Sequence, residues 1–170
     1  MSVVVQDNFL DKKYFKELQT EIISKDYRFP WYLSNIDHSG AAHGTFQMVH
    51  LAYSAPNSVS NFCANLQQLF EKLEVYSLQR VKINLQERQD KIIEHGMHID
   101  FSDVPENALT SILYINTNNG YTKFENGEKV KSVENRLVTF PNSLRHTGST
   151  NNCDAKYRCV MNIDWIKKNK

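Results

Sequence analysis

The sequence predicts an α+β protein whose core is a double-stranded β-helix, or jelly roll, braced by helices near the N-terminus. Two observations predict this class. Up to about position 73, apolar residues recur with helical spacing in two segments. After Glu74, short β-like runs alternate with turn sequences. The 170 residues suit one domain, spanning 1–170, that is large enough to enclose a small cavity.

The first predicted helix runs from Asp11 to about Lys25. Phe15, Leu18 and Ile22 recur at the spacing of one helix face, and Asp11 is available as the N-terminal cap. These apolar side chains are expected to pack against a sheet.

The second predicted helix runs from about Pro56 to Leu73. Its apolar stripe consists of Val59, Phe62, Leu66, Leu69, Phe70 and Leu73. Between the two helices, residues 26–54 show only short strand-like runs. The aromatic segment Tyr27–Tyr32 in this stretch is interpreted as packing against the sheet, with a substrate wall or lid as the alternative.

Seven β runs are predicted after Glu74, which suits a double-sheet jelly roll. They are Ser77–Leu85, Gly96–Phe101, Thr110–Asn116, Tyr121–Phe124, Arg136–Phe140, Leu144–Thr147 and Tyr157–Trp165. Turn sequences separate them at 118–120, 125–127 and 141–142, and a longer loop covers 148–154.

Charge and composition exclude several classes of partner. The chain carries 20 basic and 19 acidic residues, a net charge of +1, so no bulk field favours nucleic acid or an acidic membrane surface. No long apolar stretch or N-terminal signal pattern occurs, so a soluble, cytoplasmic protein is expected. Cys63, Cys153 and Cys159 are interpreted as reduced structural thiols. The oligomeric state is not indicated.

The most informative motif is His98-Ile99-Asp100. In an extended strand, residues at i and i+2 point to the same face, so His98 and Asp100 can reach one metal ion together. His95 and His98 could instead form a metal-binding pair, but their offset of three sends them to opposite faces of a strand. His95 is therefore interpreted as a surface or supporting histidine.

His146 follows the predicted strand that ends at Phe140, and Arg158 begins the last one. A second imidazole would complete a set of two histidines and one carboxylate, the ligands of non-haem Fe(II) oxygenases. In the last strand Tyr157, Cys159, Met161, Ile163 and Trp165 share one largely apolar face, with Arg158, Val160 and Asn162 on the other. An arginine pointing into a barrel requires an anion, and its planar fork suits a carboxylate.

From Val81 to Trp165 the chain resembles the Fe(II)- and 2-oxoglutarate-dependent oxygenase superfamily, whose motif is H-x-D, a distal His and then a basic residue. Within it, the chain is similar to the prolyl-hydroxylase-like branch. It also resembles short members of this kind, with helices and a jelly roll, that are carried by marine bacteriophages. There a strand ending Tyr-Leu-Asn precedes a Gly-Gly-x-x-x-Phe segment; here Tyr114-Ile115-Asn116 and Asn119-Gly120-Tyr121-Thr122-Lys123-Phe124 occupy those places. Asn119 replaces the first glycine, a modest departure because Asn tolerates left-handed turns.

The resemblance implies that His98, Asp100 and His146 bind iron and that Arg158 binds the distal carboxylate of 2-oxoglutarate. It also implies that Tyr114 donates a second hydrogen bond to that carboxylate. An ordinary strand tyrosine is the alternative for Tyr114. Asn84 shares a face with Lys82 and is expected to touch the cosubstrate or the substrate.

The implied reaction hydroxylates an unactivated C–H bond with O2 while 2-oxoglutarate is decarboxylated to succinate, with ascorbate as a candidate reductant. Peptidyl proline or another amino-acid side chain is the first expected substrate, and a free amino acid or small metabolite is the alternative. Nucleic acid is disfavoured, because nucleic-acid demethylases of the superfamily have an arginine where this chain has Asp164.

Two further alternatives remain open at the sequence level. The chain could be a catalytically silent jelly-roll module that binds iron or 2-oxoglutarate. A cupin-type metal protein is a weaker alternative, because the H-x-H motif of cupins is absent and His98 pairs with Asp100 instead.

Overall fold

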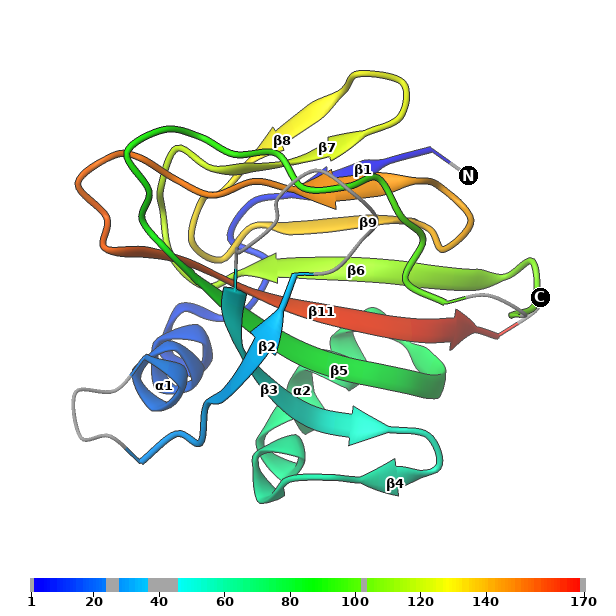
Figure 1. Cartoon of the computed structure of the whole chain (residues 1–170). Coiled ribbons are helices and arrows are strands. Elements are labelled where there is room, and N and C mark those ends of the chain that lie inside the picture. Colours follow the sequence, from blue (N-terminus) through cyan, green and yellow to red (C-terminus); the bar gives the residue numbers. More distant parts are fainter. Residues whose placement is uncertain (1, 24–27, 37–45, 102–103, 169–170) are drawn as a thin grey trace.

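The computed structural model of the chain describes residues 2–23, 28–36, 46–101 and 104–168 (Figure 1). Three helical segments occur in these residues: α1 (Lys12–Ile22), the 3-10 helix η1 (Asn61–Leu66) and α2 (Gln67–Leu73). Within this part of the chain, no helix is long and apolar enough to span a membrane.

Antiparallel strands form two sheets. The larger sheet has the order β1-β9-β6-β11-β5-β3-β2, with β4 also paired to β3, and the smaller has the order β10-β7-β8. The strands are β1 (Val4–Gln6), β2 (Tyr32–Asn35), β3 (Phe46–Ser54), β4 (Asn57–Ser58), β5 (Val75–Glu87), β6 (Ala108–Tyr114), β7 (Tyr121–Phe124), β8 (Lys129–Lys131), β9 (Leu137–Pro141), β10 (His146–Gly148) and β11 (Tyr157–Lys167). Two sheets braced by N-terminal helices confirm the predicted α+β jelly-roll class.

The two faces of the larger sheet are buried against different layers. On one face, Cys159, Met161, Ile163 and Trp165 of β11 join the core that includes α1 and α2. On the other face, Val160 joins Phe124, Phe140 and their neighbours in a second core between the sheets. The predicted division of β11 into an apolar face and a face with Arg158 is therefore confirmed, and the second face lines the space where the functional side chains gather.

The first predicted helix is confirmed as α1. The carboxylate of Asp11 accepts hydrogen bonds from the backbone N–H groups of Lys13 (2.9 Å) and Tyr14 (3.2 Å), which satisfies donors at the helix start. Phe15, Leu18 and Ile22 are buried, as their spacing predicts. The helix ends at Ile22, and the predicted end at Lys25 lies outside the described residues.

The second predicted helix is wrong in its first half. The carbonyl of Ala52 accepts hydrogen bonds from the N–H groups of Val59 and Ser60, so this stretch continues the β3–β4 hairpin and leaves Val59 exposed. Only beyond Ser60, whose hydroxyl accepts a hydrogen bond from the N–H of Phe62, does the chain become helical. Apolar spacing alone does not reveal that a carbonyl outside this stretch, that of Ala52, will bond these N–H groups.

The stretch 26–54 contains the main strand that the sequence reasoning missed. β3 is nine residues long and pairs with β5. The short strands β1, β2, β4 and β8 were also not predicted, and none of them exceeds four residues. Short edge strands depend on partners that are distant in sequence, so their local patterns are weak.

The predicted strand Gly96–Phe101 is not a regular strand. Within it, an isolated bridge joins His98 to His146, and a second bridge, from Glu94 to Ser149, lies just before it. The bridge at His98 consists of one pair of backbone hydrogen bonds with His146.

Candidate metal and cosubstrate site

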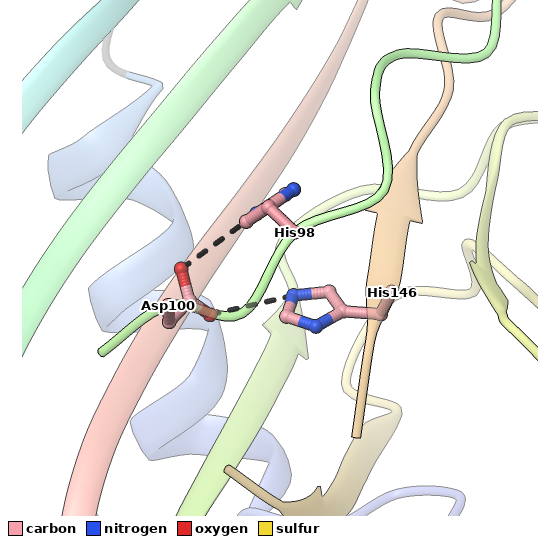
Figure 2. Close-up of side chains that lie close together, drawn as sticks. All are labelled: His98, Asp100 and His146. Carbon is pink, nitrogen blue, oxygen red and sulfur yellow. Dashed lines mark ion pairs between the residues drawn. The ribbon is translucent and has the colours of Figure 1, made fainter. Parts of the chain in front are cut away.

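One backbone contact brings the predicted metal ligands together. The N–H of His98 donates to the carbonyl of His146, and the N–H of His146 donates to the carbonyl of His98, both at 2.9 Å. With Asp100 two residues further on, one potential ligand atom from each side chain lies within 4.8 Å of the others. Figure 2 shows the carboxylate of Asp100 facing both imidazoles. The Asp100 oxygens lie 3.3 Å from Nε2 of His146 and 3.8 Å from Nε2 of His98.

The outer nitrogens of both imidazoles are committed to backbone carbonyls. Nδ1 of His98 lies 3.1 Å from the carbonyl of Gly96, and Nδ1 of His146 lies 3.3 Å from the carbonyl of Leu144. A carbonyl only accepts, so each Nδ1 carries a proton, and Nε2 is the nitrogen of each ring that faces Asp100. Two Nε2 atoms and a carboxylate that converge in this way can bind one cation together. The donor set therefore fits a divalent metal ion.

Asp100 is buried and ionised. Burial alone raises the pKa of its carboxyl, but the imidazole of His146, the guanidinium of Arg80 and His98 outweigh it, and the net shift is downward. Arg80 donates from Nη2 to Oδ1 of Asp100 at 2.7 Å. An ionised carboxylate is the form that binds a metal.

The cluster opens into a cavity of about 120 Å³ between the two sheets. Its lining also includes Lys82, Asn84, Gln86, Thr122, Arg158 and Asn162. β5 and β11 of the larger sheet supply most of these, and β7 of the smaller sheet supplies Thr122. The metal-ligand candidates and Arg158 thus face one enclosed space.

Arg158 is buried and has no acidic partner in the described part of the chain. Its Nε donates to the hydroxyl of Ser132 at 3.0 Å, and Nη2 donates to the hydroxyl of Thr122 at 3.3 Å. Its exposed fraction is 4%, and burial lowers the pKa of its guanidinium. The guanidinium also lies over the ring of Tyr114, 5.8 Å from its centroid. A desolvated charge with no negative partner among the described residues is unfavourable until an anion pairs with it. Arg158 therefore points into the space between the sheets, as predicted.

Asn116 holds the backbone on both sides of Arg158. Its Nδ2 donates to the carbonyl of Tyr157 at 2.8 Å, and its Oδ1 accepts from the N–H of Cys159 at 2.9 Å. The Asn of the Tyr-Ile-Asn sequence thus fixes the start of β11 and the direction in which the arginine leaves it.

Tyr114 lies behind the cavity wall rather than in it. Its fully buried hydroxyl donates to Oγ1 of Thr122 at 2.8 Å and lies 3.2 Å from the carbonyl of Val130. Thr122, which contacts both Tyr114 and Arg158, lines the cavity in its place. The hydrogen bond from Tyr114 to a bound carboxylate stays a prediction, and Thr122 is a residue that sequence reasoning missed.

Two other sequence candidates also line the cavity. Oδ1 of Asn84 is buried and has no hydrogen-bond partner among the described residues, as expected of a group that meets a ligand. His95 is not a surface residue: it is buried, and its Nε2 lies 2.9 Å from Nε2 of Gln86. It is not part of the three-residue cluster.

Residues 28–32 of the aromatic segment do not line this cavity. Phe29 is buried, and its ring packs against Trp31, His50 and Phe62 with centroid separations of 4.3 to 5.1 Å. The packing interpretation is confirmed for these residues, and Tyr27 lies outside the described residues.

No protein-family model matches the chain, and no curated protein matches it. Solved structures do. A prolyl-4-hydroxylase from Pseudomonas putida superposes with a TM-score of 0.62 at 14% identity, over 98% of this chain and 93% of that one. A prolyl hydroxylase from Trichoplax adhaerens, in complex with a hypoxia inducible factor peptide, gives 0.66 at 12% identity over 97% and 83%. The chain has the fold of the 2-oxoglutarate and Fe(II) oxygenases.

This oxygenase fold is also that of SnoN, a non-haem α-ketoglutarate-dependent epimerase from nogalamycin biosynthesis, with a TM-score of 0.69 at 12% identity over 97% and 78% of the two chains. The resemblance to the prolyl-hydroxylase-like branch, identified from motifs, is confirmed at the level of the fold. Because hydroxylases and an epimerase share it, the fold does not specify a substrate.

Sequence reasoning missed Arg80, Thr122 and Ser132, which bond Asp100 or Arg158 in the candidate site. Hydroxyl residues are common in strands, so neither Thr122 nor Ser132 stands out in the sequence. Thr122 of β7 and Ser132, directly after β8, reach Arg158 through the pairing of these two strands. Arg80 lies 20 positions before Asp100, and its alternation with Lys82 and Asn84 along one strand is the signal that could have found it.

A first prediction concerns Gly120. A methyl group there would lie 2.7 Å from Cδ of Arg158 and 2.9 Å from the carbonyl oxygen of Thr150. Gly120→Ala is therefore expected to displace Arg158, to lower the free energy of unfolding by about 1–3 kcal/mol and to weaken 2-oxoglutarate binding about tenfold, a loss of about 1.4 kcal/mol. Calorimetric titration of the Mn(II)-loaded protein measures the binding.

Gly127→Ala is the matched control. Gly127 has a φ of +87° and open space around it, so alanine costs stability by backbone strain without touching Arg158. Its affinity for 2-oxoglutarate should equal that of the wild type. Equal affinity in the Gly120 variant would contradict the prediction.

A second prediction concerns the segment that leads to His98. Glu94 accepts hydrogen bonds from the hydroxyl of Tyr121 and from the ammonium groups of Lys123 and Lys129. The bonds from Lys123 and Tyr121 lower the pKa of Glu94 to about 2. This stabilisation is complete above the ordinary pKa near 4.5 and is lost as the pH falls toward 2.

Glu94→Gln is expected to reduce the free energy of unfolding at pH 7 by no more than about 1 kcal/mol, because water screens these partly exposed pairs. Urea unfolding at a series of pH values measures it. The difference between variant and wild type should shrink steadily below pH 4.5, and a difference that grew in acid would refute the assignment.

Proposed function

We propose that the protein is an Fe(II)- and 2-oxoglutarate-dependent dioxygenase that hydroxylates an unactivated C–H bond. The carrying observation is that two imidazoles and a carboxylate converge in one small cavity with a buried arginine that has no acidic partner among the described residues. The first feature suits a cation and the second suits an anion.

In this proposal His98, Asp100 and His146 hold the iron. Both imidazoles are oriented by backbone carbonyls, and Asp100 is kept ionised by its cationic neighbours. Three protein ligands leave coordination positions open for a chelating cosubstrate and O2.

The cosubstrate is held at its distal end by Arg158. The hydroxyls of Ser132 and Thr122 fix the guanidinium on one side, and Asn116 fixes the backbone around it. Tyr114 supports Thr122 from behind, and Asn84 offers a buried amide to the cosubstrate or substrate. The apolar side chains of Ile112 and Val160 limit access of water to the same cavity.

When bound, iron would activate O2, and the oxidative decarboxylation of 2-oxoglutarate to succinate would supply two of the electrons that reduce it. The chain supplies placement. It binds both groups, orients them along one cavity and shields them from water.

Peptidyl proline or another amino-acid side chain is the proposed substrate. It is supported by the shared fold with two prolyl hydroxylases, one of which was solved with a peptide. A free amino acid or small metabolite is the second candidate. It is supported by the shared fold with SnoN, which was solved in complex with nogalamycin RO. The near-neutral net charge and Asp164 argue against nucleic acid.

The test is anaerobic reconstitution with Fe(II), 2-oxoglutarate and ascorbate, followed by exposure to O2 with a panel of proline-containing peptides, free amino acids and metabolites. Succinate release and the mass gain of one oxygen atom are measured together. Hydroxylation of a peptide supports the first candidate and hydroxylation of a small molecule the second. Tight binding of both cofactors without any succinate would establish a silent binding module instead.

A further inference from the structure

Arg80 links the metal-ligand candidate Asp100 to a second buried carboxylate. Its Nη2 donates to Oδ1 of Asp100 at 2.7 Å, and its Nε donates to Oδ2 of Asp164 at 2.8 Å. Both carboxylates are almost completely buried, with 6% and 2% of their side chains exposed. A guanidinium can do this because its donors point in fixed, different directions.

Asp164 is itself held from the opposite side. The hydroxyl of Thr110 donates to Oδ1 of Asp164 at 2.9 Å, and Nδ2 of Asn142 donates to the same hydroxyl at 3.2 Å. Asp164 lies directly opposite Arg80 on β5 and opposite Thr110 on β6. Three neighbouring strands therefore form a rigid base for the guanidinium.

Asp100 has little else to orient it. No backbone hydrogen bond joins residues 99–101 to the rest of the described chain, and the last backbone contact before Asp100 is the bridge at His98. Arg80 bonds Oδ1, which also lies 3.8 Å from Nε2 of His98. The buried Oδ2 accepts no hydrogen bond from the described residues and lies 3.3 Å from Nε2 of His146. One oxygen is thus already bonded to arginine, and the other faces His146 and is available to a metal.

We infer that Arg80 is a positioning residue that makes Asp100 a ligand through one oxygen only, and that Asp164 fixes Arg80 and offsets its charge beside the metal. Without Asp164, a second cation would stand next to a divalent ion and weaken its binding. The inference rests on the proposed metal site.

The test uses the metal-free protein and Co(II), whose absorption spectrum reports coordination. The main variant is Arg80→Met combined with Asp164→Asn. It removes both charges of this ion pair, so neither remains buried without the other. Its Co(II) Kd is expected to rise about 10- to 100-fold, with a changed spectrum, as for other partners that orient metal ligands. Arg80→Lys is the second variant, because it keeps the charge but lacks the fork, and it should also weaken binding.

Lys82→Met is the matched control. It removes a cation from the same strand and the same cavity wall, but Lys82 donates no hydrogen bond to Asp100 in the described structure. Its Co(II) spectrum should match the wild type, and its Kd should be equal or lower, because the substitution removes a cation near a divalent ion. An equal loss of affinity in this variant would mean that any disturbance of this cavity wall weakens binding, and it would overturn the inference.

The outcomes separate this inference from the proposed function. If wild-type protein binds no Co(II), the proposed metal site fails and the inference fails with it. If wild-type protein binds Co(II) and both Arg80 variants retain its Kd and spectrum, only the role of Arg80 is refuted, even if their thermal stability falls. Should the double variant not fold, Arg80→Lys decides alone.

Discussion

Replacing His146 with alanine is expected to abolish Fe(II)-dependent succinate formation. His146 contributes one of three proposed ligands and, through its backbone, the bridge that holds His98. Loss of one imidazole removes the Nε2 lone pair that faces Asp100, so Co(II) affinity should fall at least about 100-fold, or about 2.7 kcal/mol. Succinate assays and Co(II) titrations measure the two effects separately.

Loss of the ring also leaves a hole beside Phe140, whose centroid is 4.7 Å from that of His146. A stability cost of about 1–3 kcal/mol is therefore expected from packing alone. His50→Ala is the matched control, because both histidines are 2% exposed and the imidazole of His50 bonds Pro30 and Ser60 rather than a metal-ligand candidate. The His50 variant should lose similar stability and keep metal binding. Full activity in the His146 variant would show that His146 is not a metal ligand.

Replacing Arg158 with methionine is expected to reduce 2-oxoglutarate affinity selectively. Methionine fills similar space without charge, so a bound carboxylate would lose its cationic partner at a cost of about 2–4 kcal/mol, or about 30- to 1000-fold in Kd. Calorimetric titration of the Mn(II)-loaded protein with 2-oxoglutarate measures this loss. The affinity for Mn(II) itself should not change.

The same variant has an unusual expected effect on stability. Arg158 has no ion pair with any described residue, so removing its buried charge should leave the ligand-free protein as stable as before or more stable. Arg88→Ala, at an exposed position outside the cavity, is the control for loss of one arginine. Wild-type affinity for 2-oxoglutarate in the Arg158 variant would show that another group binds the carboxylate.

Several parts of this molecule follow from local pattern. The period of two along Tyr157–Trp165 separates Arg158, Val160 and Asn162 from the apolar residues, and the structure has this division. The i, i+3 and i+7 spacing of Phe15, Leu18 and Ile22 predicts α1. The pattern failed at 56–60, where Ala52 supplied backbone partners that no local rule registers.

The sequence by itself determined which side chains are available as ligands and which face of each long strand they occupy, because both properties depend on residues one to four positions apart. The tertiary structure alone decided that His146 meets His98, that Thr122 stands before Tyr114, and that Arg80 joins Asp100 to Asp164. Arg80 and Asp164 are 84 positions apart and meet only because β5 and β11 pair in one register. Strand register is a collective result of packing both faces of a sheet, so no short stretch of sequence specifies it.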